Sequence, residues 1–432
     1  GAGTPLFYEH PLHIVRGGRL RALPDTSLLG FPTSMRSLVT TTAFGWGGKA
    51  RMAGELFVPR RAEAADVSIA SFVGRRFGRH AVSYIAETLL AGIHGGDAAR
   101  LSMQALYPDL RREFAAYMRT AYPAWLKTLE GDRPPLSIDI VSEFLLPILE
   151  RSRATLFIVI DCLRLDQWRV LQPLLAPYFD VETTHYFSIL PTATPYSRNA
   201  LFSGLFPGEI AARFPDWWGD REDESLNAHE RELIEAHLKD LRVPVPVRYD
   251  KISTSGDSAE LERRLTSAIA AEGVSAFVFN FVDLLTHGRS ESAILYEVAK
   301  DEIALRQITR QWFERSVLFA LLKEAARRGI PALVTSDHGS IHCLTPATVF
   351  AKRDATANLR YKFGEDLRAE RSEHALLFSN SDDLRLPRRG MGANSLLAVG
   401  DTFFVYPTKL REYQSRYRGS FLHGGVTPEE VI

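Results

Sequence analysis

Three continuous apolar runs constrain the fold of this chain more than any other feature. They cover residues 155–160, 276–282 and 331–335, and none of them alternates polar with apolar side chains. Unbroken runs of this length are typical of strands that helices cover on both faces, as in a parallel sheet. A long helical pattern over 296–328 separates the second run from the third. The sequence therefore predicts an α/β fold, with a mostly parallel sheet and helices on both faces.

The residues before the first run divide into two segments. Residues 66–150 carry apolar side chains at helical spacing, for example Val82, Ile85 and Leu89, so we expect a small helical domain that packs on the sheet. Glycine, proline and arginine dominate the start of the chain, and no role can be assigned to it. We predict an N-terminal appendage over 1–65, a helical domain over 66–150 and a catalytic domain over 151–432.

Charge and cysteine content narrow the class of protein. Basic and acidic residues both number 52, and this zero net charge disfavours a surface that coats nucleic acid. We find neither an apolar run of the roughly 18 residues that span a bilayer nor a signal peptide. Cys162 and Cys343 lie near strand-like runs, which indicates buried free thiols in a reducing compartment. We therefore expect a cytoplasmic protein without membrane contact.

Aspartate stands at the end of each apolar run. The three are Asp161, Asp283 and Asp337, and His287 and His338 accompany the second and the third. In open α/β sheets the functional site lies beyond the carboxyl ends of the strands, so we expect these side chains to meet there. Carboxylate and imidazole together suit a divalent transition metal, zinc first, although manganese accepts the same ligands.

A candidate nucleophile lies between the first and second runs. The segment 191–199 contains Thr192 and Thr194 and leads into a helical stretch that reaches Gly204. A threonine hydroxyl is a poor nucleophile at its free pKa, but coordination to a metal ion can bring that pKa close to neutrality. Read alone, this segment is only a loop between prolines that enters a helix.

Taken in order, these motifs resemble those of the alkaline phosphatase superfamily. The threonine segment is similar to the nucleophile segment of nucleotide pyrophosphatase/phosphodiesterases. The chain resembles the PglZ-type branch more closely, especially the phosphatase part of PorX-like response regulators. This resemblance covers about residues 154–432 and is carried by the segments 160–168, 186–194, 336–339, 358–362 and 421–426. The receiver domain that opens PorX-like proteins is not found in residues 1–65, which puts phospho-relay control in doubt.

The resemblance implies an alkaline-phosphatase-like fold with two divalent metal ions, most readily zinc. The implied ligands are Asp161, Asp337, His338 and Thr194 for one ion, and Asp283, His287 and His423 for the other. Thr194 would attack phosphorus in line and form a phospho-threonine, which water would then hydrolyse. We prefer Thr194 to Thr192 because Thr194 keeps the ten residues to Gly204 that the diesterase pattern has.

Other residues are predicted to contact substrate. Arg198 follows Thr194 by four residues, and its guanidinium is expected to hold a phosphoryl oxygen, with a surface helix arginine as the alternative. Sulfatases of the superfamily carry arginine at this offset after a cysteine nucleophile, so threonine at that position disfavours sulfatase activity. Further substrate contacts are predicted for Arg164, Asn199, Arg360 and Lys362, the last two with an ordinary basic loop as the alternative.

The resemblance favours a phosphodiesterase that acts on nucleotides or short oligonucleotides. Two alternatives stay open. One is a phosphomonoesterase or phosphomutase of the same fold, and the other is a metal-bound signalling or defence scaffold with little catalysis. PglZ-type proteins serve in signalling and phage-defence assemblies, so the resemblance also implies a signalling-complex partner. A homodimer fits such a role.

Overall fold

The structure is a computed structural model in which the chain forms two compact units, Gly1–Leu110 and Arg111–Ile432. The described residues are 13–16, 19–22, 27–28, 31–32, 49, 97–128, 133–218, 227–252, 258–269, 271–288, 292–299, 301–351, 356–388 and 392–432.

Short antiparallel pairs make up the described strands of the first unit. Strand β1 (His13–Arg16) pairs with β2 (Arg19–Ala22), and β3 (Ser27–Leu28) pairs with β4 (Phe31–Pro32). Helix α6 (Asp97–Lys127) begins in the first unit and ends in the second.

A four-stranded parallel sheet forms the centre of the second unit, in the order β6-β7-β5-β8. The strands are β5 (Ala154–Ile160), β6 (Val247–Ile252), β7 (Gly273–Phe279) and β8 (Ala332–Thr335). Strand β5 lies between β7 and β8, and all seven residues of β7 are buried. The two central strands, β5 and β7, are mostly apolar, as expected for strands that helices cover on both faces.

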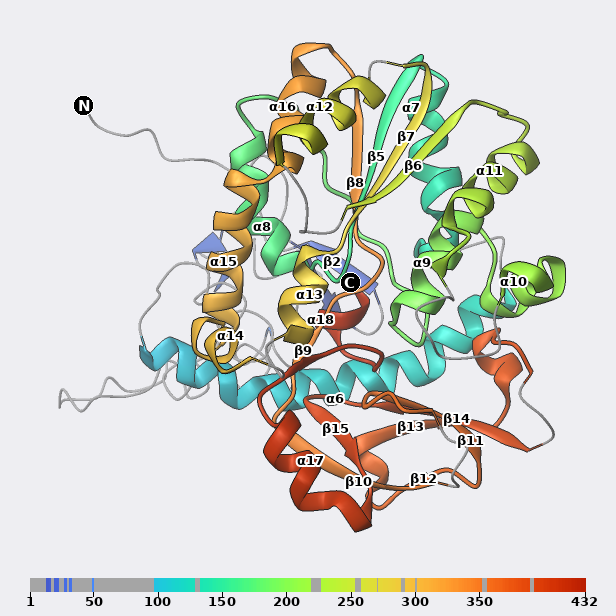
Figure 1. The fold of residues 1–432 in the computed structure, drawn as a ribbon. Coiled ribbons are helices and arrows are strands. Elements are labelled where there is room, and N and C mark those ends of the chain that lie inside the picture. The colour runs from blue at the N-terminus through green and yellow to red at the C-terminus, as the bar shows by residue number, and fades with distance from the viewer. Residues whose placement is uncertain are drawn as a thin grey trace. The chain divides into compact units, whose positions relative to one another are not determined.

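Helices α8, α12, α15 and α16 cover one face of this sheet, and α7, α9 and α11 cover the other (Figure 1). Their bounds are α7 (Leu146–Leu149), α8 (Leu165–Leu175), α9 (Thr194–Ser203), α11 (Glu230–Asp240), α12 (Ser258–Ile269), α15 (Glu302–Arg315) and α16 (Val317–Arg327). The shorter helical elements are η3 (Ser137–Asp139), η4 (Ile140–Leu145), α10 (Pro207–Arg213), η5 (Pro215–Trp217), α13 (Phe281–Gly288) and α14 (Ala293–Val298).

The alternation of side chains along β5 divides the core into two layers. Leu156 and Ile158 belong to a cluster with residues of α8, α12 and α16, whereas Phe157 and Val159 belong to a cluster with residues of α9 and α11. Successive residues of a strand point to opposite faces, so a single strand anchors both helical layers. All four of these side chains are fully buried.

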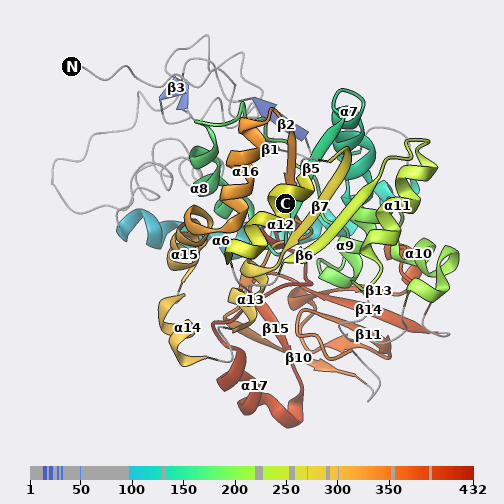
Figure 2. The ribbon, with the colours of Figure 1, turned by 45° about the horizontal axis from the view of Figure 1, so that its top comes forward.

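The residues after β8 add smaller sheets beside the carboxyl edge of the central sheet (Figure 2). Two of them are three-stranded, in the orders β12-β10-β15 and β11-β14-β13, and β16 pairs antiparallel with β9. The elements are β9 (Ile341–His342), β10 (Thr345–Phe350), β11 (Tyr361–Glu365), β12 (Arg368–Ala369), η7 (Ser372–His374), β13 (Ala375–Phe378), η8 (Ser381–Leu384), β14 (Ala393–Ala398), β15 (Thr402–Val405), η9 (Pro407–Lys409), α17 (Leu410–Tyr417), β16 (Phe421–Leu422) and α18 (Pro428–Val431).

The predicted α/β class and parallel sheet are confirmed, with one correction. Strand β7 ends at Phe279, and Val282 lies in α13, so the second apolar run is a strand followed by the start of a helix. A short apolar run does not reveal where the period changes from two to 3.6 residues. Strand β6, of sequence VRYDKI, has no apolar run because it lies at the sheet edge and is only partly buried.

The described residues of α6 that belong to the second unit pack on the sheet. Ala115, Met118 and Tyr122 of α6 share one hydrophobic cluster with Phe157 of β5. The residues from Arg111 to the sheet therefore share the core of the second unit, and the domain boundary at residue 150 stays a prediction. The boundary predicted at residue 65 lies outside the described residues.

Two further expectations concern the cysteines and the membrane. Cys162 and Cys343 are both buried and free, as predicted. Among the described helices, none combines the length and apolar character that a membrane span requires.

Candidate metal centre

Asp161 and Asp337 lie beside each other at the carboxyl edge of the central sheet. Asp161 directly follows β5, and Asp337 follows β8 after one serine. These strands are parallel neighbours, so their ends meet at one edge and bring the two carboxylates together. Both side chains are buried, with 3% of Asp161 and none of Asp337 exposed to solvent.

Asp161, Asp337 and His338 form the first group of ligand-type side chains, which we call the closed cluster. The Nε2 atom of His338 lies 3.8 Å from Asp161 Oδ1 and 3.7 Å from Asp337 Oδ2. The backbone N–H groups of Cys162 and His338 both donate to Asp337 Oδ1, at 3.2 and 3.0 Å. Cys162 adopts a positive φ of 64°. The backbone thus holds one oxygen of Asp337 and leaves Oδ2 facing the cluster.

Asp283, His287 and His423 form the second group, which we call the open cluster. Asp283 and His287 lie one turn apart on α13, which places their side chains on the same face. His287 Nε2 lies 3.3 Å from Asp283 Oδ1 and 3.0 Å from His423 Nε2. The imidazole of His287 is half exposed, so this group faces solvent on one side. Asp283 therefore lies in a helix. The sequence had indicated that Asp283 ends a strand, and that prediction is wrong.

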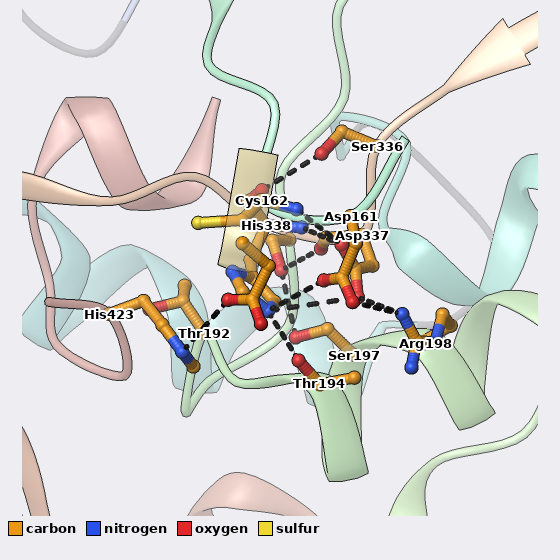
Figure 3. A network of polar contacts seen from close by, with 12 residues as sticks. Asp161, Cys162, Thr192, Thr194, Ser197, Arg198, Ser336, Asp337, His338 and His423 are labelled. Atoms are coloured by element: carbon orange, nitrogen blue, oxygen red, sulfur yellow. Dashed lines mark hydrogen bonds and ion pairs between the residues drawn. The ribbon is translucent and has the colours of Figure 1, made fainter. Parts of the chain in front are cut away.

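The two clusters are neighbours. The rings of His338 and His423 stack with their centroids 4.3 Å apart, and the planes differ by 21°. Figure 3 shows both rings beside Asp161 and Asp337. The structure thus gathers six predicted ligands, from segments as distant as residues 161 and 423, at one edge of the sheet.

The chemistry of these clusters fits divalent cations. Among the described residues, none donates a hydrogen bond to Asp161 Oδ1, Asp337 Oδ2 or Asp283 Oδ1, and all three atoms are buried. Orphaned buried oxygens are costly, and three of them on ligand-type carboxylates indicate a positive group that completes their coordination. Six oxygen and nitrogen ligands in two neighbouring groups of three are a donor set that zinc or manganese accepts.

The electrostatics of the clusters lead to the same conclusion. Burial raises the pKa of Asp161 well above its usual range; Arg198 opposes the shift, and the Asp337 and Asp283 carboxylates add to it. Burial, together with His338 and His287, lowers the pKa of His423 well below its usual value. Burial opposes the lowering of the Asp283 pKa, but His287, His423 and His338 together outweigh it. A bound cation would favour carboxylate and neutral imidazole in every case.

Thr194 faces the closed cluster from the start of α9. Its Oγ1 lies 2.9 Å from Nε2 of His338 (Figure 3), and α9 begins at this residue. The first turn of a helix carries a partial positive charge that favours an anion such as a phosphoryl group. Gly204 closes the helix in the left-handed region, at φ 66°. The predicted nucleophile thus lies within reach of the predicted ligands.

The competing threonine, Thr192, has a different environment. It is fully buried, its Oγ1 donates to the carbonyl of Gly425 at 2.9 Å, and it accepts from the N–H of Gly424 at 3.2 Å. Both partners belong to the loop that follows His423. The Thr192 hydroxyl therefore ties this loop to the nucleophile segment, which favours Thr194 as the attacking residue.

Arg198 lies one turn after Thr194 on α9 and is 96% buried. Its Nη1 donates to Asp161 Oδ2 and lies 3.7 Å from Asp337 Oδ2, while Nε donates to Glu230. Among the described residues, none accepts a hydrogen bond from Nη2. The surface alternative for Arg198 is therefore wrong, and its guanidinium contacts the carboxylates of the closed cluster.

Glu230 is a site residue that the sequence did not reveal. It begins α11, is 1% exposed, and accepts from Arg198 and from the phenol of Tyr249 on β6. Lys251 Nζ lies 3.3 Å from its Oε2. Glu230 holds Arg198 through Nε, whereas Asp161 accepts from Nη1. In the sequence it lies in a polar run that reads as an exposed helix, which is why it was missed.

The four predicted substrate contacts are all buried and all partnered. Arg164 pairs with Asp166 at 2.8 Å, and Asn199 donates to the carbonyl of Pro195. Lys362 donates to the carbonyl of Thr356. All four side chains therefore pack inside the protein. For Arg360 and Lys362, the sequence could not distinguish such packing from an ordinary basic loop.

Arg360 requires an explicit correction. It is fully buried, forms an ion pair with Glu430, and donates to the carbonyls of Gly400 and Thr402. Its guanidinium is occupied by protein groups. We therefore do not retain Arg360 as a substrate contact, nor Lys362, which is 1% exposed.

Comparisons with known proteins show two kinds of likeness. The chain is 37% identical over 94 residues to coproporphyrinogen III oxidase of Propionibacterium freudenreichii subsp. freudenreichii, over 22% of this chain and 18% of that protein. It is 35% identical over 90 residues to the Bacillus subtilis (strain 168) protein of the same name, over 21% and 19%. The chain thus spans about a fifth of the length of these curated relatives.

Among solved structures, the fold is similar to murine ectonucleotide pyrophosphatase/phosphodiesterase 5. The TM-score is 0.44 at 13% identity, over 64% of this chain and 86% of that one. The family model that matches is described as the BREX system PglZ alkaline phosphatase-like domain, over residues 141–432. This match covers more than half of the chain and includes both clusters and Thr194. The chain therefore belongs to the PglZ family of alkaline phosphatase-like domains.

Proposed function

We propose that this protein is a metal-dependent phosphodiesterase that acts on nucleotides or short oligonucleotides through a phospho-threonine on Thr194. One observation carries the proposal. The hydroxyl of Thr194 lies 2.9 Å from Nε2 of His338, and the ring of His338 stacks on that of His423, so the nucleophile lies beside two neighbouring groups of metal-type ligands. Membership of an alkaline phosphatase-like family supports the same chemistry.

The closed cluster with Thr194 would hold one divalent cation, zinc or manganese, and the open cluster would hold the other. Bound there, the two ions would lower the pKa of the attacking hydroxyl and offset negative charge on the phosphoryl oxygens.

The residues of the chain then perform two displacements. Thr194 loses its hydroxyl proton to solvent, and its Oγ1 attacks phosphorus as the bond to the leaving alcohol breaks and that alkoxide takes up a proton. Water next attacks the phospho-threonine, the bond from phosphorus to Oγ1 breaks, and a phosphomonoester leaves with Thr194 restored. Nη2 of Arg198 is the guanidinium nitrogen that would donate to a phosphoryl oxygen during both steps.

Hydrolysis assays on the purified protein test this proposal. Bis-p-nitrophenyl phosphate and p-nitrophenyl phosphate are compared for the wild type and Thr194→Val, with the metal content of each sample measured. We expect about two ions per chain, faster turnover of the diester, and loss of turnover in the variant. Faster turnover of the monoester would instead support the monoesterase alternative. Bound metal without turnover of either ester would support a scaffold.

A homodimer and a signalling partner remain predictions.

A further inference from the structure

The short helix α18 forms hydrogen bonds with two loops of the metal centre, the one that follows His338 and the one that follows His423. The N–H of Gly339, which follows His338, donates to the carbonyl of Glu430 at 3.0 Å. The N–H of Gly425, two residues after His423, donates to Glu430 Oε1 at 2.8 Å. One residue therefore holds both segments that carry the stacked histidines.

The nucleophile segment is joined to the same helix. The N–H of Ser188 donates to the carbonyl of Val431 at 2.7 Å, and the hydroxyl of Ser188 donates to the carbonyl of Asp337 at 2.7 Å. Helix α18 thus contacts the residue that follows His338, the loop of the open cluster and the segment that leads to Thr194.

Glu430 is itself fixed from several directions. Its side chain is fully buried, Oε1 accepts from Arg360 Nε at 3.0 Å, and Oε2 accepts from Thr427 Oγ1 at 2.9 Å as well as from Arg360 Nη2. Arg360 Nη1 donates to the carbonyl of Gly400 at 2.9 Å. A buried carboxylate with this many donors has one geometry, because any displacement leaves buried charge unpaired.

Two glycines show how close this packing is. A Cβ atom on Gly339 would lie 2.0 Å from the carbonyl oxygen of Glu429. One on Gly425 would lie 2.3 Å from Arg360 Nη2 and 2.6 Å from the carbonyl oxygen of Ala398. No side chain fits at Gly339 while α18 stays in place, and none fits at Gly425 while Arg360 and Ala398 stay in place, so this close packing depends on glycine at both positions.

We infer that Glu430, clamped by Arg360, is a positioning residue that sets the distance between His338 and His423 and so couples the two metal sites. This inference rests on the proposed function, because it takes both histidines as metal ligands. A partner that orients metal ligands from outside commonly contributes 10- to 100-fold in metal affinity. The buried ion pair then has a role in the site as well as in the fold.

Metal affinity of a matched set of variants tests the inference. Glu430→Gln keeps the shape of the side chain and removes its charge, while Thr427→Val removes one hydrogen bond to Glu430 and is the milder change. Asp139→Asn is the control, because Asp139 also pairs with a largely buried arginine, Arg133, and also accepts from a backbone N–H, that of Leu136. Zn²⁺ affinity is measured by competition with a chelator, on protein whose folding is checked by circular dichroism.

We expect Glu430→Gln to weaken binding at both sites by about tenfold or more, Thr427→Val to weaken it less, and Asp139→Asn to leave it unchanged. Folded Glu430→Gln and Thr427→Val proteins that bind two ions with wild-type affinity would overturn the inference. A loss at only one site would overturn the coupling.

Hydrogen exchange of the metal-free protein separates this inference from the proposed function. Glu430→Gln should speed the exchange of backbone amides in peptides that contain Gly339 and Gly425, relative to wild type and to Asp139→Asn. If the wild type bound no metal but this acceleration appeared, the proposed metal chemistry would fail while the positioning of the two loops by Glu430 would stand. Unchanged exchange in both peptides would refute the positioning role.

Discussion

The closed and the open clusters each present three ligand-type side chains, but on different supports. In the closed cluster, strand ends carry Asp161 and Asp337, and backbone N–H groups and Arg198 hold the carboxylates. In the open cluster, one helix carries Asp283 and His287, and a loop supplies the third ligand. Side-chain exposure follows this division, from none at Asp337 to 51% at His287. The sheet provides rigid, buried ligands, whereas the helix and loop leave the second group facing solvent.

The largest expected effect concerns Thr194, the proposed nucleophile, which lies beside His338 of the closed cluster. Thr194→Val should lower diester turnover by more than about 1000-fold, because loss of a covalent nucleophile leaves only binding and electrostatic catalysis. Valine keeps the shape but removes one expected ligand of the ion in the closed cluster, so that ion should bind more weakly while Asp161, Asp337 and His338 still hold it. Turnover is measured with bis-p-nitrophenyl phosphate.

Thr192→Val is the matched control for that experiment. It removes the hydrogen bonds to the His423 loop and should slow turnover without abolishing the phospho-enzyme, which mass spectrometry of a quenched reaction detects. A phospho-enzyme in Thr194→Val and none in Thr192→Val would reverse the assignment.

Next in size are substitutions of one ligand in each cluster. Asp337→Asn and His287→Ala should each lower metal affinity at their own site by about 100-fold.

The same two substitutions should have different effects on the thermal stability of the metal-free protein. Asp337→Asn removes a buried charge beside Asp161 and should raise the Tm by a few degrees, while half-exposed His287 should matter little. Calorimetry of chelator-treated samples measures this difference. A lower Tm for Asp337→Asn would show that its charge stabilises the metal-free site.

Metal release offers a smaller but direct comparison. With excess chelator, the fully loaded protein should lose its ions in two phases of equal amplitude, and the open cluster should empty first because solvent reaches His287. A zinc-sensitive dye records both phases, and His287→Ala should remove the fast one. A single phase in the wild type would show that the two sites exchange metal as a unit.

The smallest effect is expected from Glu230, which holds Arg198 against the closed cluster. Glu230→Gln should weaken metal binding at the closed cluster by about tenfold and leave the open cluster unchanged. Site-resolved competition titration measures both affinities. Glu235→Gln serves as a control, because Glu235 is an exposed acid on the same helix, paired with Arg231. Equal losses at both clusters in Glu230→Gln would contradict a local role for Arg198.

The class of fold could be predicted from the apolar runs, and the ligand-type residues from the strand ends together with the family resemblance. Unbroken apolar runs such as 155–160 predict buried parallel strands, and parallel strands bring the residues after them to one edge. Asp161 and Asp337 could be assigned to that edge for this reason. The bounds of β7, and with them the place of Asp283 in a helix, could not be read, because Phe281 and Val282 continue the apolar run into α13.

Tertiary structure alone decided which charged residues serve the site. Arg360 looked like an exposed basic residue and is a fully buried partner of Glu430, 70 positions away. Glu230 lies in a polar run that gave no sign of a role in the site, and in the structure it accepts a hydrogen bond from Arg198. A buried ion pair leaves no periodic pattern, since its two members come from elements that meet only when the chain folds. Hydrophobic periodicity predicts which face of a helix or strand is buried, but it does not predict which polar side chain will pair with a buried charge on that face.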